Sequence, residues 1–372
     1  MKVGVVGASG YAGVELLRLC AGHPEFEVAV ATAGGHRGEH VAHHTPSLAA
    51  AYPSLTYAPT DPSELDGLDL VFLALPHGQS QQLMADLIPR VATVVDLAAD
   101  FRLSDPSLYP LWYGETHRAP ELLGRFVYGL PELDRDQLHG AHLIAAPGCY
   151  PTAALLALAP LVRAGVVAGP TAGTPAPALI VDAASGVSGA GRAPKDSLHF
   201  GAVDEDFVAY GLLDHRHTAE MEQGLGAPVL FTPHLAPMVR GILATCYARP
   251  SGPGPGPGPG PGPGPGPGPG HDPGSDNHPA TLTTSDVLDV LHQAYDDEPF
   301  VTVTDDPPST KATSGSNCAH VTARVDPRTG WVLVICALDN LVKGASGQAV
   351  QCANLALGLT EVTSLPTVGL YP

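Results

Sequence analysis

Residues 146–152 read APGCYPT and carry the strongest candidate for covalent chemistry. An apolar stretch ends there, Gly148 provides a turn, and Pro151 is a residue that the first turn of a helix tolerates. Cys149 is therefore predicted at or beside a helix N-terminus. Backbone N–H groups and the helix dipole stabilise a thiolate at such a position, and they lower a thiol pKa from about 8.5 into the range of roughly 3.5–7.5. We interpret Cys149 as a nucleophile.

The alternative role for any cysteine is that of a small buried hydrophobic residue. The six cysteines of the chain are scattered and form no C-x-x-C pair. This usage favours reduced thiols in a cytoplasmic protein over a disulfide scaffold or a zinc site. The buried role suits four cysteines that lie inside apolar stretches, which are Cys20, Cys246, Cys336 and Cys352.

Residues 214–220, DHRHTAE, open a predicted helix and offer a proton donor and acceptor. A histidine with an ordinary pKa near about 6.5 exchanges protons at neutral pH. We choose His217 as the acid/base group, because Glu220 follows three residues later and can orient its ring. A favourable first-turn acid is the alternative for Glu220, and a capping or surface role is the alternative for His215. The two histidines lack the spacing of a zinc site, so no metal is predicted.

Residues 7–13, GASGYAG, follow an apolar run at 2–6 and open a predicted helix at 11–22. Glycines in such a loop allow a tight turn and let backbone N–H groups approach a pyrophosphate at the helix N-terminus. The G-x-x-G-x-x-G spacing also fits a structural turn, but its place after the first strand favours a dinucleotide site. The predicted contacts are Gly7, Ser9, Gly10, Tyr11 and Gly13.

The end of the second predicted strand, residues 27–32, indicates which dinucleotide binds. An NAD site usually places Asp or Glu there to bind the ribose 2′-hydroxyl. Here no acid occurs before Glu39, whereas the hydroxyl of Thr32 and the guanidinium of Arg37 suit a 2′-phosphate. We therefore predict NADP(H). A solvated loop charge is the alternative role of Arg37.

Further segments supply groups that hold anions. Residues 185–192, SGVSGAGR, follow a strand, and their N–H groups, hydroxyls and arginine suit a phosphate, although a flexible glycine turn is the alternative. Arg102 follows another strand and is expected to point towards the same crevice. Asn340, at the end of the last strand, suits the nicotinamide carboxamide. The predicted phosphate contacts are Arg102, Ser185, Ser188, Gly189 and Arg192.

A nucleophilic cysteine beside a nicotinamide implies a specific reaction. The thiolate attacks an activated acyl carbon, a leaving group departs, and hydride reduces the resulting thioester to an aldehyde. An alcohol dehydrogenase needs no such thiol. The reaction also needs a proton shuttle and groups that hold anions, which the segments above supply.

The elements that must position these groups follow two patterns. Up to about residue 150, apolar runs alternate with helical stretches, which is typical of an α/β domain with a Rossmann-like, doubly wound parallel sheet. After a helix at 153–162, runs with β-branched and intervening polar residues predict a second, α+β domain with a mostly antiparallel or mixed sheet. The runs are 2–6, 27–32, 68–75, 92–97 and 142–146, then 178–183, 229–233, 240–248, 318–325 and 331–338, with a last helix at 346–357.

Charge and composition limit the partners. The 372 residues include 18 basic and 37 acidic side chains, for a net charge of −19. Such a surface repels nucleic acid and anionic lipid, and no apolar run reaches the roughly 18 residues of a membrane span. We expect a small-molecule substrate, and no nucleic-acid or membrane partner. A strict Gly-Pro alternation at 252–270 predicts a disordered insertion over 252–280.

Taken together, the motifs resemble the N-acetyl-γ-glutamyl-phosphate reductase family, one of the aspartate-semialdehyde-dehydrogenase-like families. The resemblance covers nearly the whole chain outside the Gly-Pro tract. It rests on GASGYAG (7–13), FLALPHG (72–78), ADFRL (99–103), PGCYPTAALLAL (147–158), SGVSGAGR (185–192), HRHTAE (215–220), FTPHLAPMVRGILATCYA (231–248), GSN (315–317) and DNLVKGASGQAVQ (339–351).

The resemblance implies NADPH-dependent reduction of an acyl phosphate to a semialdehyde in arginine biosynthesis. Cys149 matches the family's nucleophile, His217 its acid/base group and Glu220 the acid beside that histidine. Pro76, in the FLALPHG motif, matches a cofactor contact. The chain differs in its long insertion and in Ala219, where the family commonly has proline.

The resemblance also implies a domain organisation and an assembly. Residues 1–148, completed by 340–372, are expected to bind NADP, and 149–339 to form the catalytic and oligomerisation domain of a homodimer or homotetramer. Two alternatives stay open. One is a reductase of aminoadipyl phosphate linked to an acidic carrier protein in lysine biosynthesis, which the net charge of −19 disfavours. The other is a non-catalytic NADP-binding regulatory module, which the presence of both thiol and imidazole disfavours.

Overall fold

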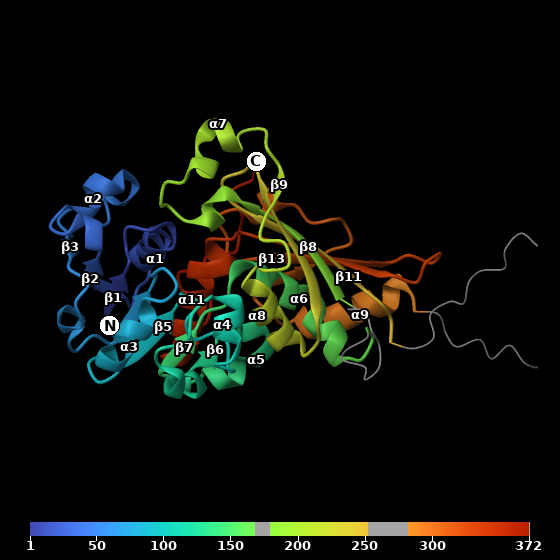
Figure 1. Ribbon diagram of the computed structural model, residues 1–372, viewed down its shortest axis with the longest axis horizontal. Helices are drawn as coiled ribbons and strands as arrows, with labels where there is room; N and C mark the ends of the chain where they lie inside the picture. Colours follow the sequence, from blue (N-terminus) through green and yellow to red (C-terminus); the bar gives the residue numbers. More distant parts are fainter. Residues whose placement is uncertain (168–178, 252–281, 372) are drawn as a thin grey trace, which may run out of the picture.

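The computed structural model describes residues 1–167, 179–251 and 282–371. The predicted disordered insertion at 252–280 lies outside these residues. Two seven-stranded sheets organise the described chain (Figure 1). No helix within the described ranges is long and apolar enough to cross a membrane.

The first sheet is entirely parallel, as the sequence predicts. Its strand order is β3-β2-β1-β4-β5-β7-β6, and every residue of β4 and β5 is buried. Burial on both faces is what a doubly wound sheet requires. The strands are β1 (Lys2–Val6), β2 (Glu27–Thr32), β3 (Tyr57–Ala58), β4 (Leu70–Leu73), β5 (Thr93–Asp96), β6 (Val127–Tyr128) and β7 (Leu143–Ala145).

Helices cover both faces of this sheet. On one face, Val350 of the C-terminal helix α11 shares a buried core with Leu17 of α1 and Val5 of β1. On the other face, Met84 of α3 and Tyr109 of α4 lie in a separate core. Figure 1 shows α11, drawn in red, beside elements from the first half of the chain. These helices are α1 (Tyr11–Ala21), α3 (Ser80–Leu87), α4 (Leu108–Trp112), α5 (Pro131–Leu138) and α11 (Gly347–Ala356), with the one-turn α2 (Val41–His44) after β2.

The second sheet is mixed, again as predicted. Its order is β12-β13-β14-β11-β8-β10-β9. The β8–β10 and β12–β13 pairs are parallel, and the other neighbours are antiparallel. The strands are β8 (Leu179–Gly186), β9 (Val208–Ala209), β10 (Val229–Ala236), β11 (Ile242–Ala248), β12 (Val301–Val303), β13 (Ala319–Val325) and β14 (Val332–Leu338).

One face of the mixed sheet packs on helices. Alternate residues of β11, such as Ile242 and Ala244, are buried against Leu155 of α6 and Leu291 of α9. The alternation is the period-two pattern of a strand with one covered face. The helices of this half are α6 (Cys149–Arg163), α7 (Phe200–Val203), α8 (His217–Leu225), α9 (Thr284–Tyr295) and α10 (Thr310–Thr313).

The expected elements agree with the structure except at short segments and some ends. Helix α6 begins at Cys149 and not at residue 153. The strands β6, β9 and β12 were not predicted, because strands of two or three residues are too short to show a periodic pattern. The strand β3, which pairs with only two residues of β2, was not predicted either.

A buried ion pair joins the C-terminal part of the chain, which packs on the first sheet, to the first half of the chain. Lys343, in the π-helical turn η7 (Val342–Ser346), has a fully buried side chain. Its Nζ lies 2.6 Å from a carboxylate oxygen of Glu132 and donates to the Gln351 side-chain oxygen at 2.8 Å. Burial of a charge is costly unless the charge is paired and hydrogen-bonded, and both conditions hold here.

We expect Lys343→Met to destabilise the protein by about 3–5 kcal/mol, because Glu132 is then left buried and charged without its partner. Thermal and denaturant unfolding would measure the effect. The double variant Lys343→Met with Glu132→Leu is the control, and it should recover part of the loss. Equal stability of the single and double variants would contradict the proposed role of the pair.

Candidate active site

Cys149 stands at the first turn of α6, as the sequence predicts. Gly148 is the N-cap, with extended backbone angles, and Cys149 is the first helical residue. The strand β7 leads into this turn, so the thiol lies at the carboxyl edge of the parallel sheet, where open α/β sheets bind ligands. The cysteine is partly exposed, whereas the other five are buried and all six are free.

The expected lowering of the thiol pKa is wrong for the protein without ligands. Burial raises the pKa of Cys149 to about 11. The Arg102 charge and the backbone N–H groups of Tyr150 and Cys149 lower it, and the Glu220 charge raises it. Dehydration of the sulfur therefore outweighs the helix terminus, and the resting group is a thiol.

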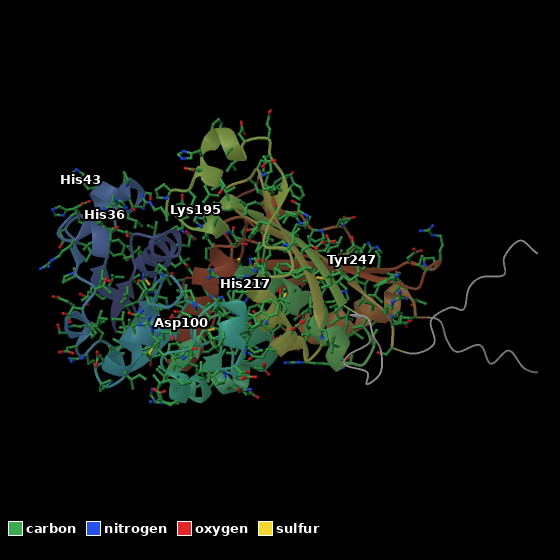
Figure 2. The ribbon with its side chains drawn as sticks, viewed as in Figure 1. His36, His43, Asp100, Lys195, His217 and Tyr247 are labelled. Atoms are coloured by element: carbon green, nitrogen blue, oxygen red, sulfur yellow. The ribbon has the colours of Figure 1, made fainter. Side chains whose placement is uncertain are left out.

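His217 lies directly against the turn that carries the thiol. A β-carbon added to Gly148 would be 2.5 Å from Nε2 of His217, so the ring edge packs on the residue before Cys149. His217 is the first residue of α8 and is 8% exposed. Figure 2 shows it in the central part of the molecule.

Burial, and then the charges of His215, Arg102 and Arg216, lower the pKa of His217 well below its usual value. The imidazole is therefore neutral at neutral pH. Its Nδ1 is buried and has no hydrogen-bond partner in the described part of the chain. A neutral ring with a neutral thiol beside it is the resting state of the site.

Glu220 is fully buried, and its contacts differ from those expected. One carboxylate oxygen accepts hydrogen bonds from the Gly148 N–H and the Tyr128 hydroxyl, each at 2.8 Å. The other lies 3.4 Å from Nη1 of Arg102. Among the described residues, Glu220 makes no hydrogen bond or ion pair with the imidazole of His217. The expectation that Glu220 orients His217 is therefore wrong, because the carboxylate is directed to the turn before Cys149.

Arg102 lies in the loop after β5, with one nitrogen directed to the site. Its Nε donates to the Ala146 carbonyl at 2.8 Å and its Nη2 to the Leu97 carbonyl at 2.7 Å. Its Nη1 faces Glu220, and a β-carbon at Gly148 would lie 2.9 Å from it. The guanidinium is 8% exposed, so it places a nearly buried positive charge beside the thiol.

The glycine loop has the geometry of a dinucleotide cradle. Gly7 has φ of +79°, and a β-carbon there would lie 2.4 Å from the Ala74 carbonyl oxygen. A β-carbon at Gly13 would lie 2.3 Å from the Gly7 carbonyl oxygen. At Gly10 the nearest atom would be 3.5 Å away, so two glycines permit close packing and the middle one leaves backbone accessible. Three other residues expected to contact the cofactor at this edge are partly or well exposed: Ser9, Tyr11 and Pro76.

Thr32 and Arg37, which are expected to bind a 2′-phosphate at the end of β2, differ in their exposure. Thr32 is fully buried, and its hydroxyl lies 3.1 Å from that of Thr60. Arg37 ends the short turn η1 (Gly34–His36) and is exposed. The hydroxyl of Thr32 is therefore occupied, whereas the guanidinium of Arg37 is accessible.

The SGVSGAGR segment forms a loop supported by Asn340. The Asn340 side chain donates to the Ser188 hydroxyl at 2.9 Å and accepts from the Gly241 N–H at 2.8 Å. Ser185 and Ser188 are buried, and a β-carbon at Gly189 would lie 2.8 Å from the Ser185 hydroxyl oxygen. Both ends of the Asn340 amide are thus engaged by the protein itself.

Arg192, at the end of that loop, reaches the other half of the molecule. Its Nη1 donates to the Ser9 carbonyl at 2.9 Å, on the glycine loop. This guanidinium is predicted to bind the substrate phosphate, whereas its contact in the structure is with the predicted cofactor loop.

Gly344 was not predicted as a site residue, but it connects the thiol to the glycine loop. A β-carbon at Gly344, in η7, would lie 2.7 Å from Cβ of Cys149. In the same turn, the Ser346 hydroxyl donates to the Ala12 carbonyl at 2.9 Å. The glycine within the DNLVKG motif was a signal for this close approach. The turn η7 therefore lies between the thiol and the helix that the glycine loop opens.

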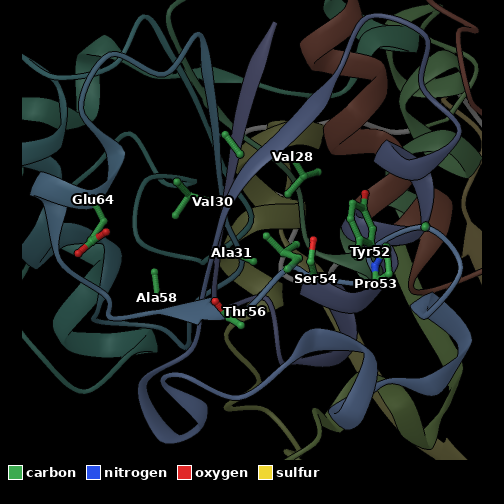
Figure 3. Close-up of a pocket in the computed structure, with 12 residues that line it drawn as sticks. Val28, Val30, Ala31, Tyr52, Pro53, Ser54, Thr56, Ala58 and Glu64 are labelled. Carbon is green, nitrogen blue, oxygen red and sulfur yellow. The ribbon is translucent and has the colours of Figure 1, made fainter.

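A cavity of about 430 Å³ lies beside β2, and none of the candidate site residues described above lines it (Figure 3). Within the described residues, two groups of titratable side chains also have ligand atoms close enough for a cation. Glu132, Glu298 and Glu361 form one group, and their charges are already offset by Arg135 and Lys343. The other group is His36, Glu39 and His44, in the loop after β2. The cavity is lined by Val28, Ala29, Val30, Ala31, Ala51, Tyr52, Pro53, Ser54, Leu55, Thr56, Ala58 and Glu64.

Family profiles and curated relatives match the whole architecture. The NAD-binding domain of semialdehyde dehydrogenase matches residues 2–141, and the semialdehyde dehydrogenase dimerisation domain matches 149–254 and 277–340. The N-acetyl-gamma-glutamyl-phosphate reductase of Acidothermus cellulolyticus is 46% identical over 100% of this chain and 99% of its own length. The proteins of that name from Symbiobacterium thermophilum and Desulforudis audaxviator are 45% and 44% identical, over 100% of this chain and 99% and 100% of theirs.

Solved structures show the same fold at low identity. Aspartate semialdehyde dehydrogenase II of Vibrio cholerae superposes with a TM-score of 0.65 and 16% identity, over 96% of this chain and 98% of that one. The Candida albicans enzyme solved with NADP gives a TM-score of 0.61 and 16% identity, over 95% and 97%.

The matched domains indicate that this chain binds a nicotinamide cofactor and oligomerises. With its parallel cofactor sheet, its mixed second sheet and its full-length relatives, the chain belongs to the semialdehyde dehydrogenase family of oxidoreductases, and within it to the N-acetyl-γ-glutamyl-phosphate reductases.

Proposed function

We propose that this protein reduces N-acetyl-L-glutamyl 5-phosphate with NADPH to N-acetyl-L-glutamate 5-semialdehyde and phosphate, a step of arginine biosynthesis. The observation that carries the proposal is the arrangement at the start of α6, where His217 packs on Gly148 and Arg102 faces the same turn. The names of the full-length relatives support the substrate. No observation favours the carrier-linked alternative.

In the first half of the reaction, Cys149 becomes acylated. Neutral His217 takes the proton of the thiol as the sulfur attacks the acyl carbon, because the free thiolate is disfavoured in this buried site. A carbon–sulfur bond forms, the carbon–oxygen bond to phosphate breaks, and inorganic phosphate leaves. Arg102, Ser185, Ser188 and Gly189 are proposed to hold the phosphate group as charge builds on it.

In the second half, the thioester carbon is reduced; the loop of Gly7, Gly10 and Gly13 would hold NADPH, which would supply the hydride for this reduction. The N–H groups at the start of α6 stabilise the oxygen anion that forms on the Cys149 adduct. The carbon–sulfur bond then breaks, the aldehyde is released, and His217 returns its proton to the sulfur. Glu220 acts in both halves as a positioning residue, since it holds Gly148 and Arg102 in place.

The cofactor specificity is proposed from the loop after β2. No acid precedes Glu39 there, and the accessible Arg37 suits a phosphate better than a ribose hydroxyl. Thr32 lines the same strand end. The pyrophosphate is proposed to lie on the glycine loop, and Asn340 to donate its second amide hydrogen to the nicotinamide carboxamide. The proposed cradle comprises Gly7, Ser9, Gly10, Tyr11, Gly13 and Pro76.

We also propose the domain limits, the assembly and the compartment. Residues 1–148 with 340–372 are proposed as the cofactor domain and 149–339 as the catalytic domain, because α11 packs with α1 on the first sheet. A homodimer or homotetramer is proposed on the matched dimerisation domain. Six free cysteines suit the reducing conditions of the cytoplasm.

The reverse reaction tests the function. N-acetylglutamate semialdehyde, inorganic phosphate and NADP should yield NADPH, and omission of phosphate should stop the reaction, because phosphate releases the acyl group from the thioester. Cys149→Ser should lose roughly 10³-fold or more of this activity while it still binds NADPH. Absorbance of NADPH measures the first result and fluorescence titration the second.

Two outcomes of that assay would contradict the proposal. Reduction of NADP at full rate without phosphate would indicate a hydrolytic dehydrogenase. Turnover of a carrier-linked aminoadipyl phosphate, with none of the free acetylated substrate, would assign the enzyme to the alternative pathway.

The reactivity of Cys149 should depend on pH in a way set by its raised pKa. With a pKa of about 11, the thiolate fraction at pH 8 is about a thousandth. Below the pKa, this fraction increases about tenfold for each unit by which the pH is raised. Alkylation of the ligand-free protein by iodoacetamide, followed by mass spectrometry of the Cys149 peptide, should show this slope. Cys149→Ser is the control for labelling elsewhere. An apparent pKa near or below about 8.5 would contradict the structure.

Substitution in the glycine loop should separate cofactor binding from folding. Gly10→Ala should leave the unfolding temperature unchanged, since its β-carbon meets no atom within 3.5 Å, but it should weaken NADPH binding about tenfold or more by obstructing the pyrophosphate. Gly13→Ala should lower the unfolding temperature itself, because its β-carbon meets backbone at 2.3 Å. Unchanged NADPH affinity in a folded Gly10→Ala protein would argue against this cradle.

A further inference from the structure

Two fully buried aspartates have no role in the proposed chemistry. Asp96 ends β5, Asp100 lies in the loop that follows, and both side chains are 0% exposed. Between them lies the hydroxyl of Ser80, the first residue of α3, at 2.9 Å from an oxygen of each carboxyl group. Two ionised carboxylates at such a separation repel each other, and burial strengthens the repulsion because little water screens it. Such a pair is tolerated when one of its members carries a proton.

The serine between the two carboxyl groups indicates that a proton is present. The Ser80 hydroxyl has one hydrogen, so it can donate fully to only one of the two. It takes part in the second hydrogen bond as an acceptor, and this requires a hydrogen on the other carboxyl group. The geometry therefore favours two hydrogen bonds that run in one direction, from a neutral carboxyl group through the serine to a carboxylate.

Asp100 is the member of the pair that its surroundings keep ionised. Its Oδ1 accepts from the Gly78 N–H at 2.7 Å, and its Oδ2 accepts from the Gln81 N–H at 3.0 Å. Nδ1 of His77 lies 2.6 Å from Oδ1. Burial opposes the charge of Asp100, but these contacts together lower its pKa below the usual value. The proton therefore belongs on the other carboxyl group, that of Asp96.

Asp96 has fewer groups that stabilise a negative charge. Apart from Ser80, one N–H in the described ranges donates to it, that of Ala98, at 3.0 Å from Oδ1. Burial, and then the Asp100 charge, raise the pKa of Asp96 to about 8. The two hydrogen bonds and the Arg102 charge lower it, but they do not outweigh burial. Oδ2, which faces the serine, is therefore the atom that carries the proton at neutral pH.

The other titratable groups of this region lie on the Asp100 side. Nε2 of His77 is 3.1 Å from a carboxylate oxygen of Glu115, which is partly exposed. The backbone carbonyl of Asp100 accepts from the Tyr109 hydroxyl and lies 2.7 Å from Nε2 of His117. Figure 2 labels Asp100 in the half of the molecule that carries the parallel sheet. These contacts fix the charged member of the pair in place.

Asp96 shapes the turn that orients Arg102. Its Oδ1 accepts from the N–H two residues further on, which closes a turn over 96–98. The Leu97 carbonyl, inside that turn, accepts from Nη2 of Arg102 at 2.7 Å. The backbone carbonyl of Asp96 accepts from the Ala146 N–H at 2.8 Å, and the Ala146 carbonyl in turn accepts from Nε of Arg102. Both carbonyls that hold the guanidinium therefore depend on the end of β5.

We propose that Asp96 is held as a neutral acid that donates through the Ser80 hydroxyl to Asp100. In this form it acts as a positioning residue for Arg102. The inference rests on the proposed function, in which Arg102 holds the phosphate group of the substrate. When Asp96 loses its proton, two buried negative charges face each other across the serine, and the turn that holds the guanidinium should open.

Urea unfolding as a function of pH tests the protonation of Asp96. An unfolded aspartate has a pKa of about 3.9, so between about pH 4 and pH 8 the native protein keeps a proton that the unfolded chain releases. A rise in pH therefore favours the unfolded state over this window. The unfolding equilibrium constant of the wild type, divided by that of Asp96→Asn, should increase about tenfold per pH unit from about pH 5 to pH 7 and level off above about pH 8. The asparagine amide can donate to Ser80 and accept from Ala98, and it does not titrate.

Asp86→Asn is the matched control. It removes one carboxylate from the exposed side of α3, the helix that Ser80 begins, and its ratio to the wild type should stay constant over the same window. Infrared spectroscopy of the wild type adds a measurement that requires no variant to fold. The C=O stretching band of a neutral carboxylic acid should be present at pH 7 and absent above about pH 9.

The reverse reaction tests the positioning of Arg102. The KM for phosphate of the wild type, divided by that of Asp96→Asn, should be constant below about pH 7 and increase roughly tenfold between about pH 8 and pH 9.5, as Asp96 ionises. The corresponding ratio of kcat should change less, because Arg102 is proposed to hold the phosphate. A merely structural loss would lower kcat with the amount of folded enzyme and leave the KM for phosphate unchanged.

The outcomes separate the inference from the proposed function. An unfolding ratio that does not change with pH, without the infrared band, would overturn the protonation of Asp96. A phosphate KM with the same pH dependence in the wild type and in Asp96→Asn would overturn the positioning role. Reduction of NADP by the wild type without phosphate would overturn the proposed function and the positioning role together, whereas the unfolding ratio and the infrared band would still decide the protonation.

Discussion

The buried carboxylate of Glu220 is the interaction on which the candidate active site depends. It is fully buried, and it contacts the Gly148 N–H, the Tyr128 hydroxyl and the Arg102 guanidinium. These partners come from the start of α6, from β6 and from the loop after β5, while Glu220 itself belongs to α8. A buried charge is tolerated only when such partners surround it. The carboxylate therefore joins the helix that carries His217 to the turn that carries the thiol.

The burial of this arrangement also keeps the Cys149 thiol and the His217 imidazole uncharged. The thiol pKa is raised to about 11, and the pKa of His217 is lowered well below its usual value. Proton transfer from sulfur to imidazole is therefore uphill in the protein without ligands. The Arg102 charge and the backbone N–H groups at the start of α6 favour the thiolate, but they do not outweigh the burial of the sulfur.

Contacts between the two halves of the molecule use residues far apart in sequence. The turn η7 places Gly344 against Cys149 and Ser346 against Ala12, and the buried pair of Lys343 and Glu132 holds that turn. Arg192 makes a second contact between the halves, a hydrogen bond to the Ser9 carbonyl on the glycine loop. The thiol and the proposed cofactor cradle are thus joined by packed backbone and not by a flexible linker, which suits hydride transfer to an adduct on the sulfur.

Local patterns in the sequence were sufficient to predict the strands β1 and β2, the position of Cys149 at the start of a helix, and the glycine loop. A continuous apolar run, a Gly-Cys-x-Pro turn and closely spaced glycines each act over a few residues. The combination of motifs was sufficient to predict the family. The partners of Glu220, the contact of Arg192 and the raised thiol pKa were decided only by the tertiary structure. Each of them depends on which groups from distant segments surround a side chain and on how much water they exclude. That environment is a property of the packed molecule, and no local pattern of residues encodes it.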